Sequence, residues 1–188
     1  MAADPEKRAS LFVTCLVDQL FPEVGVSTVR LLRSLDVEVD FPRDQTCCGQ
    51  PLYNSGFARG ARDLATRVLD TFQPEQRSDD GHYVVLPSGS CTSMVRVFYP
   101  HLFQGQPALH QRALALADRV YELSQFLVDI LKVSDVGSTF EGKVAYHPSC
   151  HLLRELEVVK QPVALINSVK GVLPVEIERA ETCCGFGG

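Results

Sequence analysis

Short apolar segments alternate with longer amphipathic segments along the chain. Segments rich in Val, Ile, Leu and aromatic residues are predicted strands: Leu11–Thr14, Val37–Phe41, Tyr83–Leu86, Val144–Tyr146 and Val172–Ile177. Several of them lack clean alternation of polar and apolar positions, as is typical of parallel strands buried on both faces. Because helices are predicted between them, the pattern indicates βαβ units and a mainly parallel sheet.

The amphipathic segments predict helices. From Phe57 to Phe72 apolar residues recur every three or four positions and form one face. From Leu109 to Ile130 they recur at alternating steps of four and three, which predicts a long helix packed on its own sheet rather than a coiled coil. A shorter helix is predicted over Val26–Leu35.

The cysteines repeat along the chain. Cys15 is followed, after 31 residues, by Cys47-Cys48-Gly49, and Cys150 is followed, after 32 residues, by Cys183-Cys184-Gly185. Each single cysteine ends an apolar run. Two Cys-Cys-Gly triplets at matched distances indicate an internal duplication.

The duplication predicts the domain organisation. We expect an α/β fold of two related, Rossmann-like repeats with parallel sheets, the first over 1–103, the second over 141–188, and a helical connector over 104–140. The first copy continues from Cys48 to Cys91, whereas the second has only four residues after Cys184. We therefore expect the second repeat to be incomplete and the chain to be a fragment of a longer protein.

Composition and charge narrow the function classes. The chain has 188 residues, with 18 Lys and Arg against 23 Asp and Glu, for a net charge of −5. An acidic chain with no basic cluster argues against nucleic acid or an anionic membrane as a partner. Its longest apolar runs are too short for a membrane span, and its first residues mix both charges without an apolar signal segment. We expect a cytoplasmic protein whose seven cysteines are reduced.

The cysteine positions point to thiolate chemistry. Every cysteine lies at or just past the end of a predicted strand, and the carboxyl ends of parallel strands meet at one edge of a sheet. Adjacent cysteines can serve one site only in a turn, and one ion shared by both would close a strained ring. A cluster offers each sulfur its own metal atom, and Gly49 and Gly185 let backbone N–H groups approach the sulfides. This pattern favours an iron–sulfur cluster.

Other uses of the cysteines stay open. A structural zinc site formed by Cys15, Cys47, Cys48 and Cys91 has the right ligand count. However, zinc ribbons pair cysteines two to four positions apart, and the sequence has no Cys-x-x-Cys. The same absence disfavours a thioredoxin-like dithiol enzyme. Buried inert thiols, or a disulfide between neighbours, are the remaining interpretations.

Three further motifs carry less weight. Residues 137–143 nearly spell a P-loop, but Val144 stands where Ser or Thr is needed and Lys143 opens a predicted strand. No Gly-x-Gly-x-x-Gly follows a strand, so no dinucleotide site is predicted. His147 and His151 bracket Cys150 and could bond a sulfur or move a proton, although packing or capping a helix is the more usual role.

The cysteine blocks resemble the cysteine-rich CCG family, which includes a cysteine-rich component of heterodisulfide reductase, the iron–sulfur subunit of glycolate oxidase and the lactate utilisation A proteins. The match to the last group is the best of the three. The blocks that carry it are Phe12-Val13-Thr14-Cys15, Thr46-Cys47-Cys48-Gly49-Gln50-Pro51, Pro87-Ser88-Gly89-Ser90-Cys91, Tyr146-His147-Pro148-Ser149-Cys150 and Thr182-Cys183-Cys184-Gly185-Phe186-Gly187-Gly188.

The resemblance implies an iron–sulfur electron-transfer subunit of a multi-subunit oxidoreductase. Such a complex would oxidise L-lactate, or a related 2-hydroxy acid, to pyruvate together with a ferredoxin-like protein and a further subunit. It implies that a first cluster, of the [4Fe–4S] type, is ligated by Cys15, Cys47, Cys48 and Cys91, and an incomplete second site by Cys150, Cys183 and Cys184. The heterodisulfide-reductase branch has a further cysteine where Ser88 stands here, which argues against disulfide-cleaving chemistry.

Overall fold

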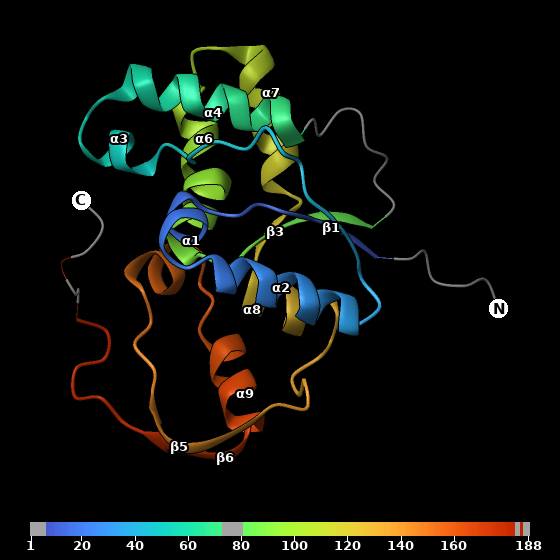
Figure 1. The fold of residues 1–188 in the computed structure, drawn as a ribbon. Coiled ribbons are helices and arrows are strands. Elements are labelled where there is room, and N and C mark those ends of the chain that lie inside the picture. Colours follow the sequence, from blue (N-terminus) through green and yellow to red (C-terminus); the bar gives the residue numbers. More distant parts are fainter. Residues whose placement is uncertain (1–6, 73–80, 183–184, 186–188) are drawn as a thin grey trace. The chain divides into compact units, whose positions relative to one another are not determined.

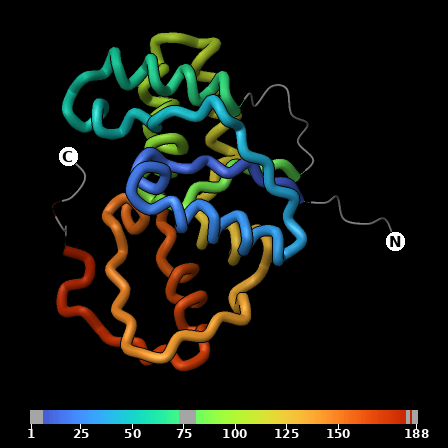
Figure 2. Tube along the Cα trace, viewed as in Figure 1, coloured from blue at the N-terminus to red at the C-terminus, as the bar shows by residue number. Residues whose placement is uncertain are grey.

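The computed structural model describes residues 7–72, 81–182 and 185 (Figures 1 and 2). The chain divides into two compact units, one ending at Glu122 and the other beginning at Leu123. Within the described residues, no helix is both long enough and apolar enough to cross a membrane.

The first unit is built on a four-stranded parallel sheet. Its strands are β1 (Arg8–Leu11), β2 (Glu38–Asp40), β3 (His82–Leu86) and β4 (Val120–Glu122), in the spatial order β2-β1-β3-β4. In register, Ser10 lies beside Asp40 on one side and Val84 on the other. The chain therefore reverses its direction of strand addition between β1 and β3, which is the point where doubly wound α/β folds bind ligands.

Helices cover both faces of this sheet (Figure 1). They are α1 (Cys15–Leu20), α2 (Pro22–Ser34), α3 (Gln50–Asn54), α4 (Ala58–Phe72), α5 (Gly89–Ser93), the π-helix η2 (Met94–Phe98), α6 (Tyr99–Leu102) and α7 (Pro107–Ala117). Helix α2 lies on one face, and α4, α6 and α7 lie on the other. Phe12 and Phe72 meet in the core with ring centroids 5.0 Å apart.

The sequence pattern locates most of this unit. The α/β class and the parallel strands are confirmed, and the predicted apolar face of α4 is buried at Ala61, Ala65, Val68, Leu69 and Phe72. The predicted strand Leu11–Thr14 is displaced, because β1 spans Arg8–Leu11. Thr14 instead caps α1, its Oγ1 accepting a hydrogen bond from the Val17 N–H at 3.4 Å.

The prediction of one helix from Leu109 to Ile130 is wrong. Helix α7 ends at Ala117, and the chain then forms β4 before α8 (Leu123–Gln125) and the π-helix η3 (Phe126–Ile130). Val120 pairs with Val84 in the sheet and is fully buried there. A buried place in the sheet therefore outweighs the helical spacing. The segment 104–140, predicted as a helical connector, thus contains a strand of the first sheet.

The second unit holds a two-stranded parallel sheet. Its elements after η3 are β5 (Thr139–Ala145), η4 (His151–Glu155), α9 (Lys160–Ser168) and β6 (Lys170–Val175). Ala145 lies beside Val175 in register. Both strands begin and end earlier than the predicted segments Val144–Tyr146 and Val172–Ile177.

Candidate functional site

The cysteines of the first repeat follow three strands of the first sheet. Cys15 is the first residue of α1, just after β1. Cys47 and Cys48 lie in the loop after β2, and Cys91 lies in α5, just after β3. All four therefore stand at the carboxyl edge of the sheet, and Cys15 and Cys91 flank the point between β1 and β3 where the strand order reverses.

The four thiols come together at this edge. The Sγ atoms of Cys15 and Cys47 are 3.6 Å apart, and those of Cys48 and Cys91 are 3.3 Å apart. Cys48 and Cys91 are buried, whereas Cys15 and Cys47 are half-buried. Residues separated by up to 76 positions in the sequence (15 to 91) thus form one thiol site.

A glycine in the left-handed conformation directly follows the two adjacent cysteines. Gly49 has φ +85°, and its N–H donates to the Cys47 Sγ at 3.5 Å. A Cβ at this position would lie 3.3 Å from the carbonyl oxygen of Ala61. The positive φ, which glycine adopts without strain, lets the Gly49 N–H approach the Cys47 sulfur.

Replacing Gly49 by alanine is expected to destabilise the metal-free protein by about 2 kcal/mol, because the left-handed backbone and the crowding against Ala61 act together. Gly56 is the matched control. It has φ +82° with open space around its Cβ direction, so Gly56→Ala should cost only the backbone strain, about 1 kcal/mol. Urea unfolding of both variants measures the difference, and equal losses would contradict the crowding.

Side-chain hydrogen bonds hold the cysteine loops in place. The Gln45 Oε1 accepts from the Val13 N–H at 2.9 Å, and its Nε2 donates to the carbonyl oxygens of Leu11 and Pro42, both at 2.8 Å. This amide fixes the loop before the cysteine pair against the end of β1. Sequence reasoning missed Gln45, since only its contacts across 34 positions reveal the role.

Two more residues join the cysteine segments. The buried Tyr99 hydroxyl donates to the carbonyl oxygen of Cys48 at 2.8 Å. The Gln50 Nε2 donates to the carbonyl oxygen of Ser90 at 3.3 Å, which links the loop of the cysteine pair to α5. Tyr99 belongs to no sequence pattern that would have pointed to it, and Gln50 stands in the block after Cys47-Cys48-Gly49 without a role that the sequence alone assigns.

Ser88, the residue that departs from the heterodisulfide-reductase pattern, caps α5. Its Oγ accepts from the Cys91 N–H at 3.4 Å, and its carbonyl oxygen accepts from the Thr92 hydroxyl at 2.7 Å. Its side chain is therefore used to start the short helix that carries Cys91.

The thiols differ in their tendency to ionise. The hydrogen bond from Cys48 lowers the pKa of Cys47 to about 5, against the opposing effect of burial and with help from the Gly49 N–H. A hydrogen bond from the same thiol also lowers the pKa of Cys91. Burial raises the pKa of Cys15 to about 11, and hydrogen bonding to Cys47 raises the pKa of Cys48. Cys47 and Cys91 are thus favoured as thiolates, and Cys15 and Cys48 as the thiols that donate to them.

In the metal-free, reduced protein, iodoacetamide should label Cys47 before Cys15. A pKa of about 5 makes Cys47 mostly thiolate at neutral pH, whereas a pKa of about 11 keeps Cys15 protonated, and the thiolate is the nucleophile. Labelling of Cys47 should slow as the pH falls through about 5. Mass spectrometry of timed digests measures both rates, and equal labelling of the two residues at neutral pH would contradict this assignment.

The second repeat is described only in part. Cys150 is half-buried and directly precedes η4, while Cys183 and Cys184 lie outside the described residues. His147 is exposed, and the His151 Nδ1 lies 2.7 Å from a Glu155 carboxylate oxygen, one turn along η4. The role of Cys150, Cys183 and Cys184 as a second ligand set therefore stays a prediction.

The donor set of the first repeat suits soft metals. Four thiols make up the site described above, and a site of this composition can bind metal clusters through thiolates. Over residues 7–72, 81–182 and 185, no group of three or more His, Cys, Asp or Glu side chains is arranged to hold a single metal ion. The thiols stand instead as two close pairs, and the sulfur atoms of the pairs must separate for an inorganic core to lie between them.

A polar cluster on the first sheet has the residue types of a hydrolase triad but not its geometry. The Ser10 Oγ donates to the Asp40 Oδ1 at 2.7 Å and lies 2.9 Å from the His82 Nε2. The same His82 nitrogen lies 3.4 Å from the Asp40 Oδ1. A triad needs serine and aspartate on opposite ring nitrogens, and Ser10 is buried. The cluster therefore links β2, β1 and β3 rather than forming a nucleophile.

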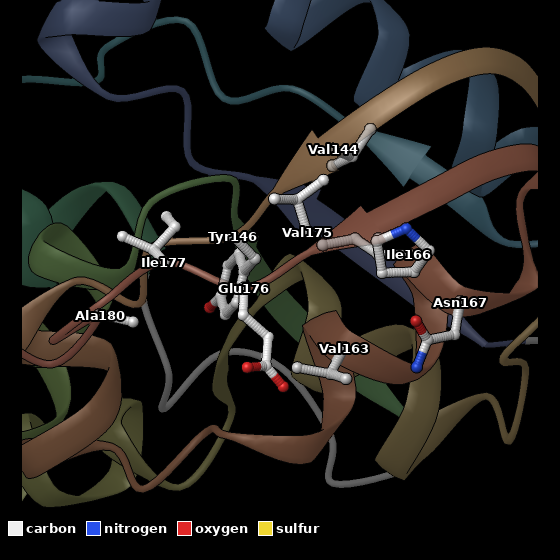
Figure 3. A pocket seen from close by; sticks show the side chains of 10 residues that line it. Val144, Tyr146, Val163, Ile166, Asn167, Val175, Glu176, Ile177 and Ala180 are labelled. Atoms are coloured by element: carbon white, nitrogen blue, oxygen red, sulfur yellow. The ribbon is translucent and has the colours of Figure 1, made fainter.

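The second unit contains a mostly apolar hollow between its sheet and α9 (Figure 3). Val144 and Tyr146 line it from the end of β5, and Val163, Ile166 and Asn167 line it from α9. Among the residues that the structure describes, no cysteine lines this hollow, so the thiol chemistry is not placed there.

A parallel α/β sheet with a thiol site at its carboxyl edge defines a class of cysteine-rich α/β domain. The model of the cysteine-rich CCG domain family matches residues 9–96 and 144–188. The first range contains Cys15, Cys47, Cys48 and Cys91, and the second contains the cysteines of the other repeat. The chain belongs to the cysteine-rich CCG domain family.

Curated relatives resemble nearly the whole chain. The chain is 49% identical to lactate utilization protein A of Oceanobacillus iheyensis over 96% of its own length and 71% of that protein. It is 50% identical to lactate utilization protein A of Bacillus subtilis, over 96% of its length and 73% of the relative. The protein of the same name from Exiguobacterium is 49% identical over 95% of the chain and 71% of the relative.

Proposed function

We propose that the chain is an iron–sulfur electron-transfer subunit of a multi-subunit oxidoreductase. The observation that carries the proposal is the approach of Cys15, Cys47, Cys48 and Cys91 to within 3.3–3.6 Å in two pairs at one sheet edge. Four thiolates are the usual ligands of a [4Fe–4S] cluster, in which each sulfur binds its own iron. Cys150, Cys183 and Cys184 are proposed to ligate a second cluster with a further ligand.

The bound cluster would store and release single electrons, and the protein would set how readily it does so. The Gly49 N–H, already 3.5 Å from the Cys47 sulfur, stabilises negative charge there. Burial of Cys48 and Cys91 keeps water from half of the thiol site. Gln45 and Tyr99 hold the ligand loops so that the four sulfurs stay at one edge.

The proposed substrate rests on the names of the relatives. Their name, lactate utilization protein A, and an identity of 49–50% support a role in taking electrons from L-lactate, or a related 2-hydroxy acid, to give pyruvate. Two electrons and two protons leave lactate in that reaction, so one-electron centres must pass the electrons on in turn. A ferredoxin-like iron–sulfur protein and a further subunit are the proposed partners.

Metal analysis of the anaerobically purified protein tests the proposal. Iron and acid-labile sulfide in equal amounts are the expected result, together with a brown colour. A colourless protein with stoichiometric zinc would contradict it and would favour a zinc-stabilised scaffold, for which the four cysteines also have the right count.

A further inference from the structure

The thiol site has one side that is open to solvent. Cys48 and Cys91 are buried, whereas Cys15 and Cys47 are half-buried. Electron transfer between proteins requires the two centres to approach closely. A partner would therefore reach the site from the side of Cys15 and Cys47.

Exposed apolar side chains follow Cys15 along α1 and into the first turn of α2. Leu16, Leu20, Phe21 and Val24 are 48%, 62%, 54% and 37% exposed, and we refer to these four residues as the α1–α2 corner. Leu16 and Leu20 are one turn apart on the same side of α1, Phe21 joins the two helices, and Val24 lies in the first turn of α2. Single exposed apolar residues are ordinary, but a group of them marks an interaction surface.

The two charged residues between Leu16 and Val24, Asp18 and Glu23, are both acidic. Both side chains are exposed. Between Arg8 and Arg30 the sequence has no lysine or arginine. An apolar centre with an acidic rim is complementary to a partner whose apolar contact is ringed by lysine or arginine.

We propose that the α1–α2 corner is the docking surface of a one-electron carrier protein with a basic rim around an exposed redox centre. The inference rests on the proposed function, because it assigns the partner of the same thiol site. In the docked complex, a cluster held by Cys15, Cys47, Cys48 and Cys91 would exchange one electron with the partner's centre. The donor is oxidised by one electron, the acceptor is reduced by one, and no bond or proton changes place.

Reduction of cytochrome c, a small basic haem protein, provides the test. The iron-loaded protein is reduced anaerobically, freed of reductant and mixed with ferric cytochrome c, and the ferrous haem is followed by stopped flow at several salt concentrations. The variants are Leu20→Ser with Phe21→Ser, and Asp18→Lys with Glu23→Lys. The controls are Leu114→Ser and Asp118→Lys, at the end of α7 that precedes β4 and hence at the opposite edge of the sheet.

Both corner variants should keep wild-type iron and sulfide but reduce cytochrome c about tenfold more slowly at low salt, and the wild-type rate should fall as salt rises. The controls should match the wild type. Equal rates in all variants with normal iron would overturn the docking proposal alone, whereas absence of iron from the wild type would overturn the proposed function. A wild type that sediments as a dimer and corner variants that sediment as monomers, with equal rates, would assign the corner to a second copy and overturn the proposal.

Discussion

Replacing Cys47 or Cys48 by serine is expected to abolish cluster assembly at the first repeat. Cys47 has its sulfur 3.6 Å from that of Cys15, and Cys48 has its sulfur 3.3 Å from that of Cys91, so each substitution removes one member of a pair. Serine is nearly isosteric but is a poor ligand for soft metals at neutral pH, which confines the change to ligation. Iron and sulfide analysis after anaerobic purification measures the loss.

Ser88→Ala is the matched control for these variants. Ser88 caps α5 through the Cys91 N–H at 3.4 Å, so its removal should cost roughly 0.5–1 kcal/mol of stability and leave the iron content unchanged. Equal iron in the Cys47, Cys48 and Ser88 variants would refute the ligand assignment. Loss of iron in Ser88→Ala alone would identify the serine as a ligand.

Phe72→Ala is expected to have the largest effect on the fold that holds the site. Phe72 ends α4, is 2% exposed, and packs its ring 5.0 Å from that of Phe12, three residues before Cys15. Truncating a buried phenylalanine leaves a cavity and costs roughly 3–5 kcal/mol. Urea unfolding of the metal-free protein measures the free energy of unfolding.

Phe57→Ala provides the comparison, because Phe57 is 64% exposed just before the start of the same helix. Phe57→Ala should lower the free energy of unfolding by no more than about 0.5 kcal/mol, as for most surface substitutions. Similar losses at the two positions would show that Phe72 does not anchor α4 in the core.

The pattern of apolar residues predicted a helix or strand correctly where the local spacing agreed with the tertiary structure. The run of apolar residues at helical spacing predicted α4, and the segment Tyr83–Leu86 lies within β3. The pattern failed for β4, where Val120 continues a helical spacing yet pairs with Val84 in the sheet. Pairing between distant segments is a tertiary effect that local periodicity does not contain.

The candidate site also combines features that the sequence predicted with features that it did not. Cysteine spacing after strands predicted that Cys15, Cys47, Cys48 and Cys91 would share one sheet edge, and Gly49 was expected to allow a close backbone approach. The residues that hold the loops were not predictable. Gln45 and Tyr99 act through hydrogen bonds to residues 34 and 51 positions away, which depend on how the chain folds back.

The arrangement of the thiols also bears on what the first repeat would do within the proposed complex. Two buried and two half-buried sulfurs at a strand switch point can hold a centre and expose one side of it. Such a centre suits the transfer of single electrons to and from a partner. The proposed role is therefore to pass electrons on, with substrate oxidation elsewhere in the complex.

Redox titration of the visible absorbance tests the central claim most directly. Addition of dithionite to the anaerobically purified protein is expected to bleach its visible absorption, and mild reoxidation should restore it, because the iron–sulfur cluster proposed for Cys15, Cys47, Cys48 and Cys91 would take up and return an electron. An absorbance that dithionite leaves unchanged, in a protein that contains its full complement of metal, would contradict the account.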